Sequence, residues 1–379
     1  MVRSAGEEVG GDSGAAPLSM LWSRHSIYAA LAVLAMFVAS RIDLRQLQRS
    51  HRWRNPLWWL VGLALVLAAL TLLPGVGRSV RGASRWLYLG PSSWGVSFQP
   101  SELLKWLMVP AIACWCAGRP DSMGKFCRGL LPPLLLVALA CCLVVIEDLG
   151  TAVLIATVSV ALLTAGGARV WQLACMAPPA VAVVVAAIWH NPYRLDRLIA
   201  FVDPWSDPEG IGYHPIQSML AIAEGGLSGR GLGSGIQKFG YLPEDTTDFL
   251  FAVICEELGL GGAVLVVGLL LLVLWTSLGI LRNCPHFFGR LLALGVMLTL
   301  GLQALINIAV VTVVVPTKGI ALPLLSAGGT GWVLTAFSLG LVASLDEARW
   351  VERQKEGAGD EGSEGSVQGS EFRVRSSEL

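Results

Sequence analysis

Long apolar runs with almost no charge recur along most of the chain, and short polar segments separate them. A helix needs about 20 mainly apolar residues to cross the roughly 30 Å hydrocarbon core of a bilayer, and helices satisfy their own backbone hydrogen bonds in lipid. The runs cover residues 25–40, 57–73, 101–117, 129–146, 149–166, 170–189, 250–280, 290–315 and 321–345. The pattern predicts an all-α integral membrane protein, a polytopic helical bundle with about nine transmembrane helices.

The composition agrees with this class. The chain is 54% hydrophobic and 14% charged, whereas soluble domains are about 45–50% apolar and about 25% charged. A β-barrel would show short alternating segments instead of these runs. The eight cysteines and five histidines are scattered without a disulfide pattern or metal-ligand spacing. We predict no metal site from the residues and no nucleic-acid partner.

Basic residues in the short loops predict the orientation, because Lys and Arg accumulate on the cytoplasmic face. Alternation of the spans places the basic loops on one face, near residues 41–56, 118–128, 167–169 and 282–290. The outer face then receives the loops at 74–100, 190–249 and 316–323. These outer loops also carry arginines and lysines, which suit an anionic ligand.

Polar tails flank the membrane domain. Residues 1–22 lack a signal-peptide pattern, and residues 346–379 are rich in Glu, Gly and Ser. We predict a disordered N-terminal tail on the outer side and a transmembrane domain at 23–345 with a large extracytoplasmic loop at 190–249. A disordered cytoplasmic tail at 346–379 completes the predicted organisation.

The outer loop 190–249 is the natural place for a functional site, because long loops in compact proteins are usually functional. It contains the glycine-rich run GGLSGRGLGSG at 225–235. The run does not follow a strand and lacks the lysine spacing of a phosphate-binding loop. A tight structural turn is therefore favoured over a phosphate loop.

Acidic residues stand where this loop meets the next apolar run. Asp248 either caps the helix or acts as a general base that accepts a proton from a hydroxyl nucleophile, and spacing favours neither. Glu256 and Glu257 lie about two turns deeper, where a charge in lipid costs roughly 2.5–3.5 kcal/mol.

A second acidic position opens the third run, in SFQPSELLKW. The spacing of Glu102 and Lys105 predicts a salt bridge, and an ionic pair inside a membrane is also a site hypothesis. The other polar candidates are Glu147, Asp148, Lys318, Gln303 and Asn307. Interhelical hydrogen bonding explains the two amides.

Several strings match one family in order along the chain. They are RGASRWLYLG at 81–90, FQPSELLK at 98–105, DLGTA at 148–152, YRLDRLIAFVDPWSDP at 193–208, YHPIQSMLAIAEGGLSGRGLGSGIQKFGYLPEDTTDFLFAVICEELG at 213–259 and PTKGIALPLLSAGG at 316–329. Over roughly residues 25–345 the chain resembles the SEDS family, the FtsW, RodA and SpoVE group. QKFGYLPE and PTKGIALP resemble the FtsW branch more than the RodA branch.

The resemblance implies the SEDS fold and a peptidoglycan glycosyltransferase that polymerises lipid II into glycan strands at the outer face of the bacterial cytoplasmic membrane, for septal wall synthesis. It also implies a class B penicillin-binding transpeptidase and other divisome membrane proteins as partners. By the family motifs, Asp248 matches the essential aspartate, and Glu102 and Lys105 match a conserved acid and base. The substrate-binding candidates, from the motifs and from the cationic outer face, are Arg81, Arg85, Arg194, Arg197, Lys238, Lys318 and Ser326.

The chain departs from the family pattern in places. Ser84 stands where the family is often basic, Ala327 replaces a usual Tyr, and Glu147 replaces a Pro before the DLG string. Members usually have ten spans, and the first run here aligns with their second.

The implied mechanism is a displacement at C1 of the muramyl sugar of lipid II. Asp248 would accept the proton of the attacking glucosamine 4-hydroxyl. Lys105, oriented by Glu102, would stabilise the departing pyrophosphate together with Arg81 and Arg197. A divalent cation, Mg or Mn, would help with the pyrophosphate, although no ligand cluster requires one. The alternatives are a lipid II flippase, a non-catalytic division scaffold, and a role in elongation instead of division.

Overall fold

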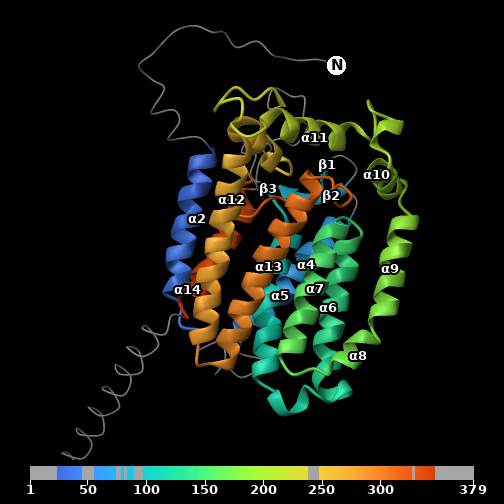
Figure 1. Cartoon of the computed structure of the whole chain (residues 1–379). Coiled ribbons are helices and arrows are strands. Elements are labelled where there is room, and N and C mark those ends of the chain that lie inside the picture. The colour runs from blue at the N-terminus through green and yellow to red at the C-terminus, as the bar shows by residue number, and fades with distance from the viewer. Residues whose placement is uncertain are drawn as a thin grey trace, which may run out of the picture.

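The structure is a computed structural model, and it describes residues 24–44, 55–73, 78–80, 83–88, 97–237, 247–326 and 329–345. Its helices stand side by side as a bundle (Figure 1). They are α2 (Arg24–Ser40), α4 (Pro56–Thr71), α5 (Pro100–Ala117), α6 (Leu131–Val145), α7 (Leu149–Ala165), α8 (Val170–Ala174), α9 (Ala177–Trp189), α12 (Leu250–Asn283), α13 (Phe287–Val311) and α14 (Thr330–Ala343). Each predicted span overlaps one of these helices or, for 170–189, the α8 and α9 pair.

Length and composition support a membrane-spanning bundle. In the described part of the chain, the helical stretches long and apolar enough to cross a bilayer number four, namely Phe126–Val145, Val170–Trp189, Leu250–Asn283 and Phe287–Val311. Shorter apolar helices occur at Ser26–Ser40, Pro56–Thr71, Leu149–Ala165 and Thr330–Ala343. The predicted all-α polytopic fold is confirmed.

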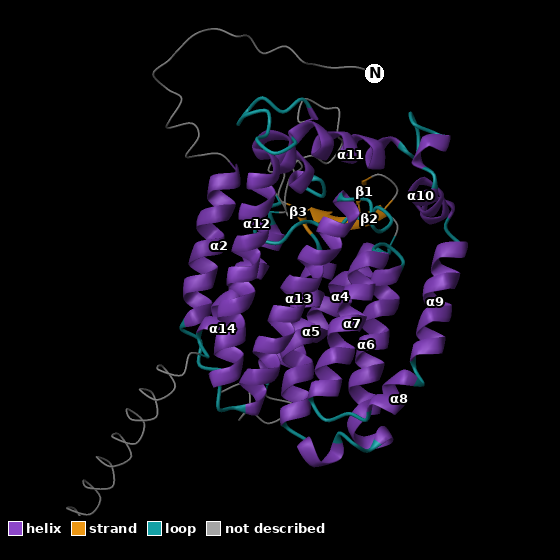
Figure 2. Cartoon of the chain, viewed as in Figure 1, coloured by secondary structure: helices purple, strands orange, loops and turns teal. Residues whose placement is uncertain are grey.

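The predicted outer loops gather at one end of the bundle. The described part of residues 190–249 forms helices there, α10 (Pro192–Val202) and α11 (Tyr213–Gly225), with a short 3-10 turn at Pro204–Ser206. A small antiparallel sheet that the sequence did not predict joins them, made of β1 (Arg78–Val80), β2 (Ala83–Tyr88) and β3 (Ser97–Phe98) in the order β1-β2-β3 (Figure 2). The loops predicted to share a face therefore do share one.

The break between α6 and α7 has a local cause. Asp148 caps α7, because one carboxylate oxygen accepts the Thr151 N–H at 3.0 Å and the other accepts the Thr151 hydroxyl at 2.9 Å. The neighbouring Glu147 accepts a hydrogen bond from the Thr71 hydroxyl at 3.3 Å. The prediction of two separate spans is confirmed, although Glu147 replaces the family's Pro.

The predicted start of the last span at residue 321 was wrong, because α14 begins at Thr330. Pro316 and Pro323 lack backbone donors, and Leu324 has a positive φ of 66°, so residues 312–326 do not continue a helix. This segment instead lines a cavity at one end of the bundle. The apolar string LPLL was mistaken for membrane helix.

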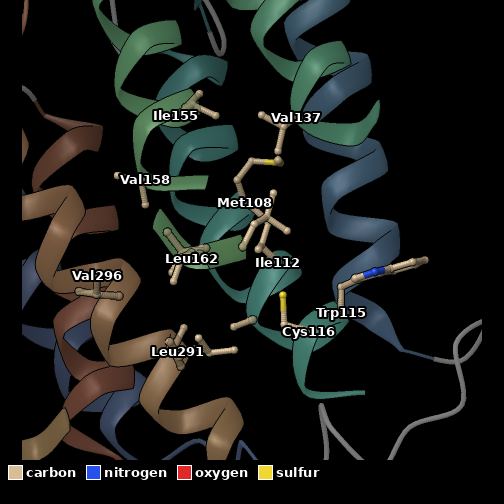
Figure 3. Packing of buried hydrophobic residues seen from close by; sticks show 14 of the residues in the cluster. Met108, Ile112, Trp115, Cys116, Val137, Ile155, Val158, Leu162, Leu291 and Val296 are labelled. Carbon is tan, nitrogen blue, oxygen red and sulfur yellow. The ribbon is translucent and has the colours of Figure 1, made fainter. Parts of the chain in front are cut away.

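The core forms around α5. Leu104, Met108 and Ile112 of α5 are at most 2% exposed and pack with buried residues of α7 and α13, as the side chains of Met108, Ile112 and Leu162 show in Figure 3. A Cβ at Gly295 would lie 2.5 Å from Val109 Cγ1, so glycine lets α13 approach α5 closely. In lipid such packing, more than the hydrophobic effect, drives helix association.

Candidate functional site

A cavity of about 460 Å³ lies at the end of the bundle that carries the sheet, α10 and α11. We call it the end pocket. Its lining comes from β2, α5, α10, α11, α13, α14, the residue before α7 and the non-helical segments before α12 and α14. The ionisable side chains that line it are Glu102, Asp148, Asp196, Arg197, Asp207, His214, Asp248 and Lys318.

Helix N-termini converge on the end pocket. Glu102 lies in the first turn of α5, Asp148 caps α7, Asp248 precedes α12, and Thr330 opens α14. The first N–H groups of a helix lack partners within the helix, and its N-terminus carries a partial positive charge. The pocket is therefore suited to an anionic group despite its carboxylates.

The predicted salt bridge of Glu102 and Lys105 is present. Lys105 Nζ lies 2.7 Å from Glu102 Oε2 and donates to Gln303 Oε1 at 2.9 Å. Glu102 lines the pocket, whereas the Lys105 side chain is only 2% exposed. Lys105 therefore lies beneath the pocket wall and holds two groups that form it.

Asp248 lies in the pocket at the start of α12. The residue at the N-cap of this helix is Phe249, which has no side-chain capping hydrogen bond, and Asp248 directly precedes it. The Asp248 carbonyl accepts from Asn307 Nδ2 at 2.8 Å, and the preceding Thr247 carbonyl accepts from the Ser326 hydroxyl. Ser326 is thus buried and fixes the backbone beside Asp248.

Two cations share one wall of the pocket. Arg197 of α10 donates to the Thr317 carbonyl at 3.1 Å, and Lys318 is the next residue. Neither forms an ion pair with any residue that the structure describes. Burial lowers the pKa of Lys318 below the ordinary lysine value of 10.5, and the charge of Asp148 opposes part of this shift.

Among the other predicted binding residues, Arg194 does not line the end pocket. Arg194 donates to the carbonyls of Ala187 at 2.9 Å, Val145 at 2.6 Å and Ile146 at 2.9 Å, so it ties α10 to the ends of α9 and α6. Arg81, Lys238 and the side chain of Arg85 lie outside the described residues.

The glycine-rich run 225–235 is a structural turn, as predicted. Glu256 is fully buried, and its carboxylate accepts the N–H groups of Ile236 at 2.7 Å and Gln237 at 3.3 Å. Arg230 bridges Glu256 at 3.4 Å and Glu224 at 3.1 Å, and the Gly235 N–H donates to Glu257 at 3.3 Å. Glu256 is therefore surrounded by protein donors and avoids the cost of a charge in lipid.

Aromatic side chains line the pocket, and sequence reasoning did not assign them to it. They are Trp86, Tyr193, His214, Phe249 and Trp332. The His214 ring stacks on Phe249 with centroids 5.9 Å apart. Aromatic walls with a few polar groups are typical of pockets that orient a ligand. Trp86, Tyr193, His214 and Phe249 belong to strings that match the family, whereas Trp332 lies outside those strings.

No group of three or more His, Cys, Asp or Glu side chains converges into a metal site within the residues that the structure describes. The groups in the end pocket that can take part in chemistry are Asp248 as a proton acceptor and Arg197 and Lys318 as ligands of an anion, with helix N-termini around them.

The fold and the end pocket define a polytopic helical membrane protein with a charged site at one end of the bundle. The family model described as cell cycle protein FTSW_RODA_SPOVE matches residues 10–350. The chain belongs to the FtsW, RodA and SpoVE family, and the predicted resemblance is confirmed.

Known relatives cover most of the chain. A probable peptidoglycan glycosyltransferase FtsW from Nitrosococcus halophilus is 38% identical over 350 residues, 91% of this chain and 87% of that protein. A protein of the same description from a Geobacter species is 37% identical over 326 residues, 85% of each chain.

Solved structures agree with the fold. A chain from a study of polymerization and crosslinking by a peptidoglycan synthase complex superposes with a TM-score of 0.69 at 30% identity, covering 89% of this chain and 92% of that chain. The crystal structure of Thermus thermophilus rod shape determining protein RodA gives a TM-score of 0.61 at 28% identity, with 89% and 90% covered.

Proposed function

We propose that the chain is a peptidoglycan glycosyltransferase that polymerises lipid II into glycan strands during cell division. Family membership and the FtsW description of its relatives support this activity. The observation that carries it is the composition of the end pocket. Asp248 lies there with Arg197 and Lys318, two cations without ion-pair partners in the described part of the chain.

The reaction forms one glycosidic bond and breaks one sugar–phosphate bond. The oxygen of a glucosamine 4-hydroxyl attacks C1 of the muramyl sugar, and its proton passes to the Asp248 carboxylate. The bond from C1 to the pyrophosphate oxygen breaks with its electron pair, and polyprenyl pyrophosphate leaves. A single displacement of this kind inverts the configuration at C1.

The leaving group gains negative charge on its bridging oxygen as the bond breaks. Arg197 and Lys318 share a wall through the Arg197 to Thr317 hydrogen bond of 3.1 Å, so both can face one pyrophosphate. Fixed cations and helix N-termini stabilise such charge without reorganisation during the reaction. Lys105 is buried below the pocket lining and binds Glu102 and Gln303, so it orients these two lining side chains.

A divalent cation, Mg or Mn, would be held by one or two carboxylates together with the pyrophosphate of the substrate, and it would neutralise charge on the leaving group. Such binding needs no cluster of three protein ligands, and the described residues contain none. The steps above involve the side chains of the protein alone.

The proposal includes the membrane location of the chain and its protein partners. The chain spans the bacterial cytoplasmic membrane, with the end pocket on the outer face and the C-terminus in the cytoplasm, and its basic loops at the opposite end support this orientation. A class B penicillin-binding transpeptidase and other divisome proteins are the partners. The structural likeness to a chain of a peptidoglycan synthase complex supports such an assembly.

The test is polymer formation by the full-length protein in liposomes that contain fluorescent lipid II, with and without a class B transpeptidase. The proposal expects a ladder of glycan polymer on a gel in at least one of the two samples. Transfer of lipid II across the bilayer without polymer in either sample would contradict the proposal and favour a flippase.

A further inference from the structure

Two non-helical segments of the end pocket are held by side chains instead of by secondary structure. One segment precedes α12 and contains Asp248, and the other precedes α14 and contains Lys318. The side chains that hold their carbonyl oxygens are Ser326, Asn307 and Gln303. Ser326 donates to Thr247, Asn307 donates to both Asp248 and Ile320 at 2.8 Å, and Gln303 donates to Ala321 at 2.9 Å.

Asn307 is the point where the two segments meet. It is 1% exposed, and its single amide nitrogen donates one hydrogen to each segment. Its two partners, the carbonyl oxygens of Asp248 and Ile320, can only accept hydrogen bonds, so the NH₂ group of the amide must be the side that faces them. The segment of Lys318 continues directly from this contact, because the Ile320 N–H donates to the Lys318 carbonyl at 2.9 Å.

Gln303 extends the same network toward α5. It lies one helical turn before Asn307 on α13, and its oxygen accepts from Lys105 Nζ at 2.9 Å. Lys105 binds Glu102 at 2.7 Å. A continuous set of hydrogen-bonded side chains therefore runs from Glu102 through Lys105 and Gln303 to the loop that Asn307 ties to Asp248.

We infer that Asn307, supported by Gln303, is a positioning residue that fixes the distance between Asp248 and Lys318 for the reaction. This inference rests on the proposed function. Ordinary interhelical hydrogen bonding would join one helix to another, whereas Asn307 joins α13 to the two pocket segments that carry the base and the cation. A misplacement of about 1 Å costs about 100-fold in rate.

The first variant is Asn307→Leu, which keeps the size and removes both hydrogen bonds. Its kcat for polymerisation should fall about 10- to 100-fold while KM stays within about threefold. The matched control is Thr299→Val on the same helix, because Thr299 is 1% exposed and its hydroxyl donates to Gly295 within α13 at 2.7 Å. The control should keep kcat within about twofold.

The second variant is Asn307→Asp, which keeps the shape if the leucine variant fails to fold. An ionised carboxylate would repel both carbonyls, whereas the protonated acid donates one hydrogen bond, and burial favours the protonated form. The activity of this variant relative to the wild type should therefore be several-fold higher at about pH 6 than at about pH 8. A purely structural role would lower thermal stability without this pH dependence.

Wild-type kcat in a folded Asn307→Leu protein, or a flat pH ratio for Asn307→Asp, would overturn the inference. Asp248→Asn in the same assay separates this failure from that of the proposed function. If the wild type makes no polymer, or if Asp248→Asn makes as much as the wild type, the proposed function fails. If Asp248→Asn is inactive and the Asn307 variants behave as the wild type, only the positioning role fails.

Discussion

Replacing the buried Glu256 by glutamine tests what holds the glycine-rich turn that follows α11. Glu256 is fully buried, and its carboxylate accepts the N–H groups of Ile236 and Gln237 at 2.7 and 3.3 Å and a guanidinium N–H of Arg230 at 3.4 Å. Glutamine keeps one acceptor oxygen and turns an NH₂ group toward donors. Glu256→Gln should therefore lose at least one hydrogen bond and leave a buried N–H without a partner.

The magnitude follows from these contacts. A hydrogen bond to a charged group contributes about 1.5–3 kcal/mol. The ion pair adds little, because the Arg230 side chain is 33% exposed and keeps Glu224 at 3.1 Å. We expect a loss of about 2–4 kcal/mol in the free energy of unfolding, which lowers Tm by about 4–16 °C.

The assay is thermal unfolding of the purified protein in detergent. The matched control is Glu224→Gln, which removes the other partner of Arg230 at a side chain that is 37% exposed. An exposed ion pair contributes about 0–1 kcal/mol, so this control should change Tm by less than about 4 °C. Equal shifts for the two variants, or no shift for Glu256→Gln, would refute the reasoning.

Three further predictions concern other parts of the molecule. Gly225→Ala should lower the yield of folded protein on a size-exclusion column, because the new Cβ would lie 1.9 Å from the Cys255 carbonyl oxygen. The control Gly268→Ala, whose Cβ would have no neighbour within 4 Å, should keep the wild-type yield, and equal yields for the two variants would contradict the prediction. Lys318→Met should raise KM for lipid II, and an unchanged KM would argue against a pyrophosphate contact. Burial lowers the pKa of Lys318 below the ordinary lysine value of 10.5, and only the protonated form attracts the anion. The affinity of the wild type for inorganic pyrophosphate should therefore begin to fall with rising pH before pH 10.5 is reached. Cys127 is exposed at the end of the bundle opposite the pocket. A membrane-impermeant maleimide should therefore label Cys127 in opened vesicles but not in intact cells. Labelling in intact cells would contradict the proposed orientation.

The spans were predictable because each is a local property of an apolar run. The α6 and α7 break was also local, since Asp148 caps α7 through Thr151, three residues away. The start of α14 was not predictable from hydropathy, because the apolar residues before Thr330 line the pocket instead of facing lipid. Hydropathy alone cannot distinguish an apolar residue that lines a pocket from one that faces lipid.

The candidate site was predictable only as far as family motifs and charge reach. They indicated Asp248, Glu102, Arg197 and Lys318, which all line one pocket in the structure. The roles of these residues stay predictions. The role of Asn307 was hidden, because its contact with Asp248 joins positions 59 residues apart in the sequence.

Lys105 shows the same limit of sequence reasoning. Its hydrogen bond to Gln303 joins positions 198 residues apart, and no pattern in the sequence indicates that its ammonium lies under the wall. Such placements are set by helix packing around α5.

The central claim is that the end pocket polymerises lipid II with Asp248 as the base. The most direct measurement is the rate of glycan polymer formation by Asp248→Asn beside the wild type and Asp203→Asn, each in liposomes with the same partner transpeptidase. Asp203 is exposed and caps the short turn at Pro204–Ser206, so its variant should retain the wild-type rate. The account predicts that Asp248→Asn loses about 100-fold or more in rate, as general-base catalysis contributes about 10²–10⁴-fold. Polymer from Asp248→Asn at the rate of the Asp203→Asn control would contradict it.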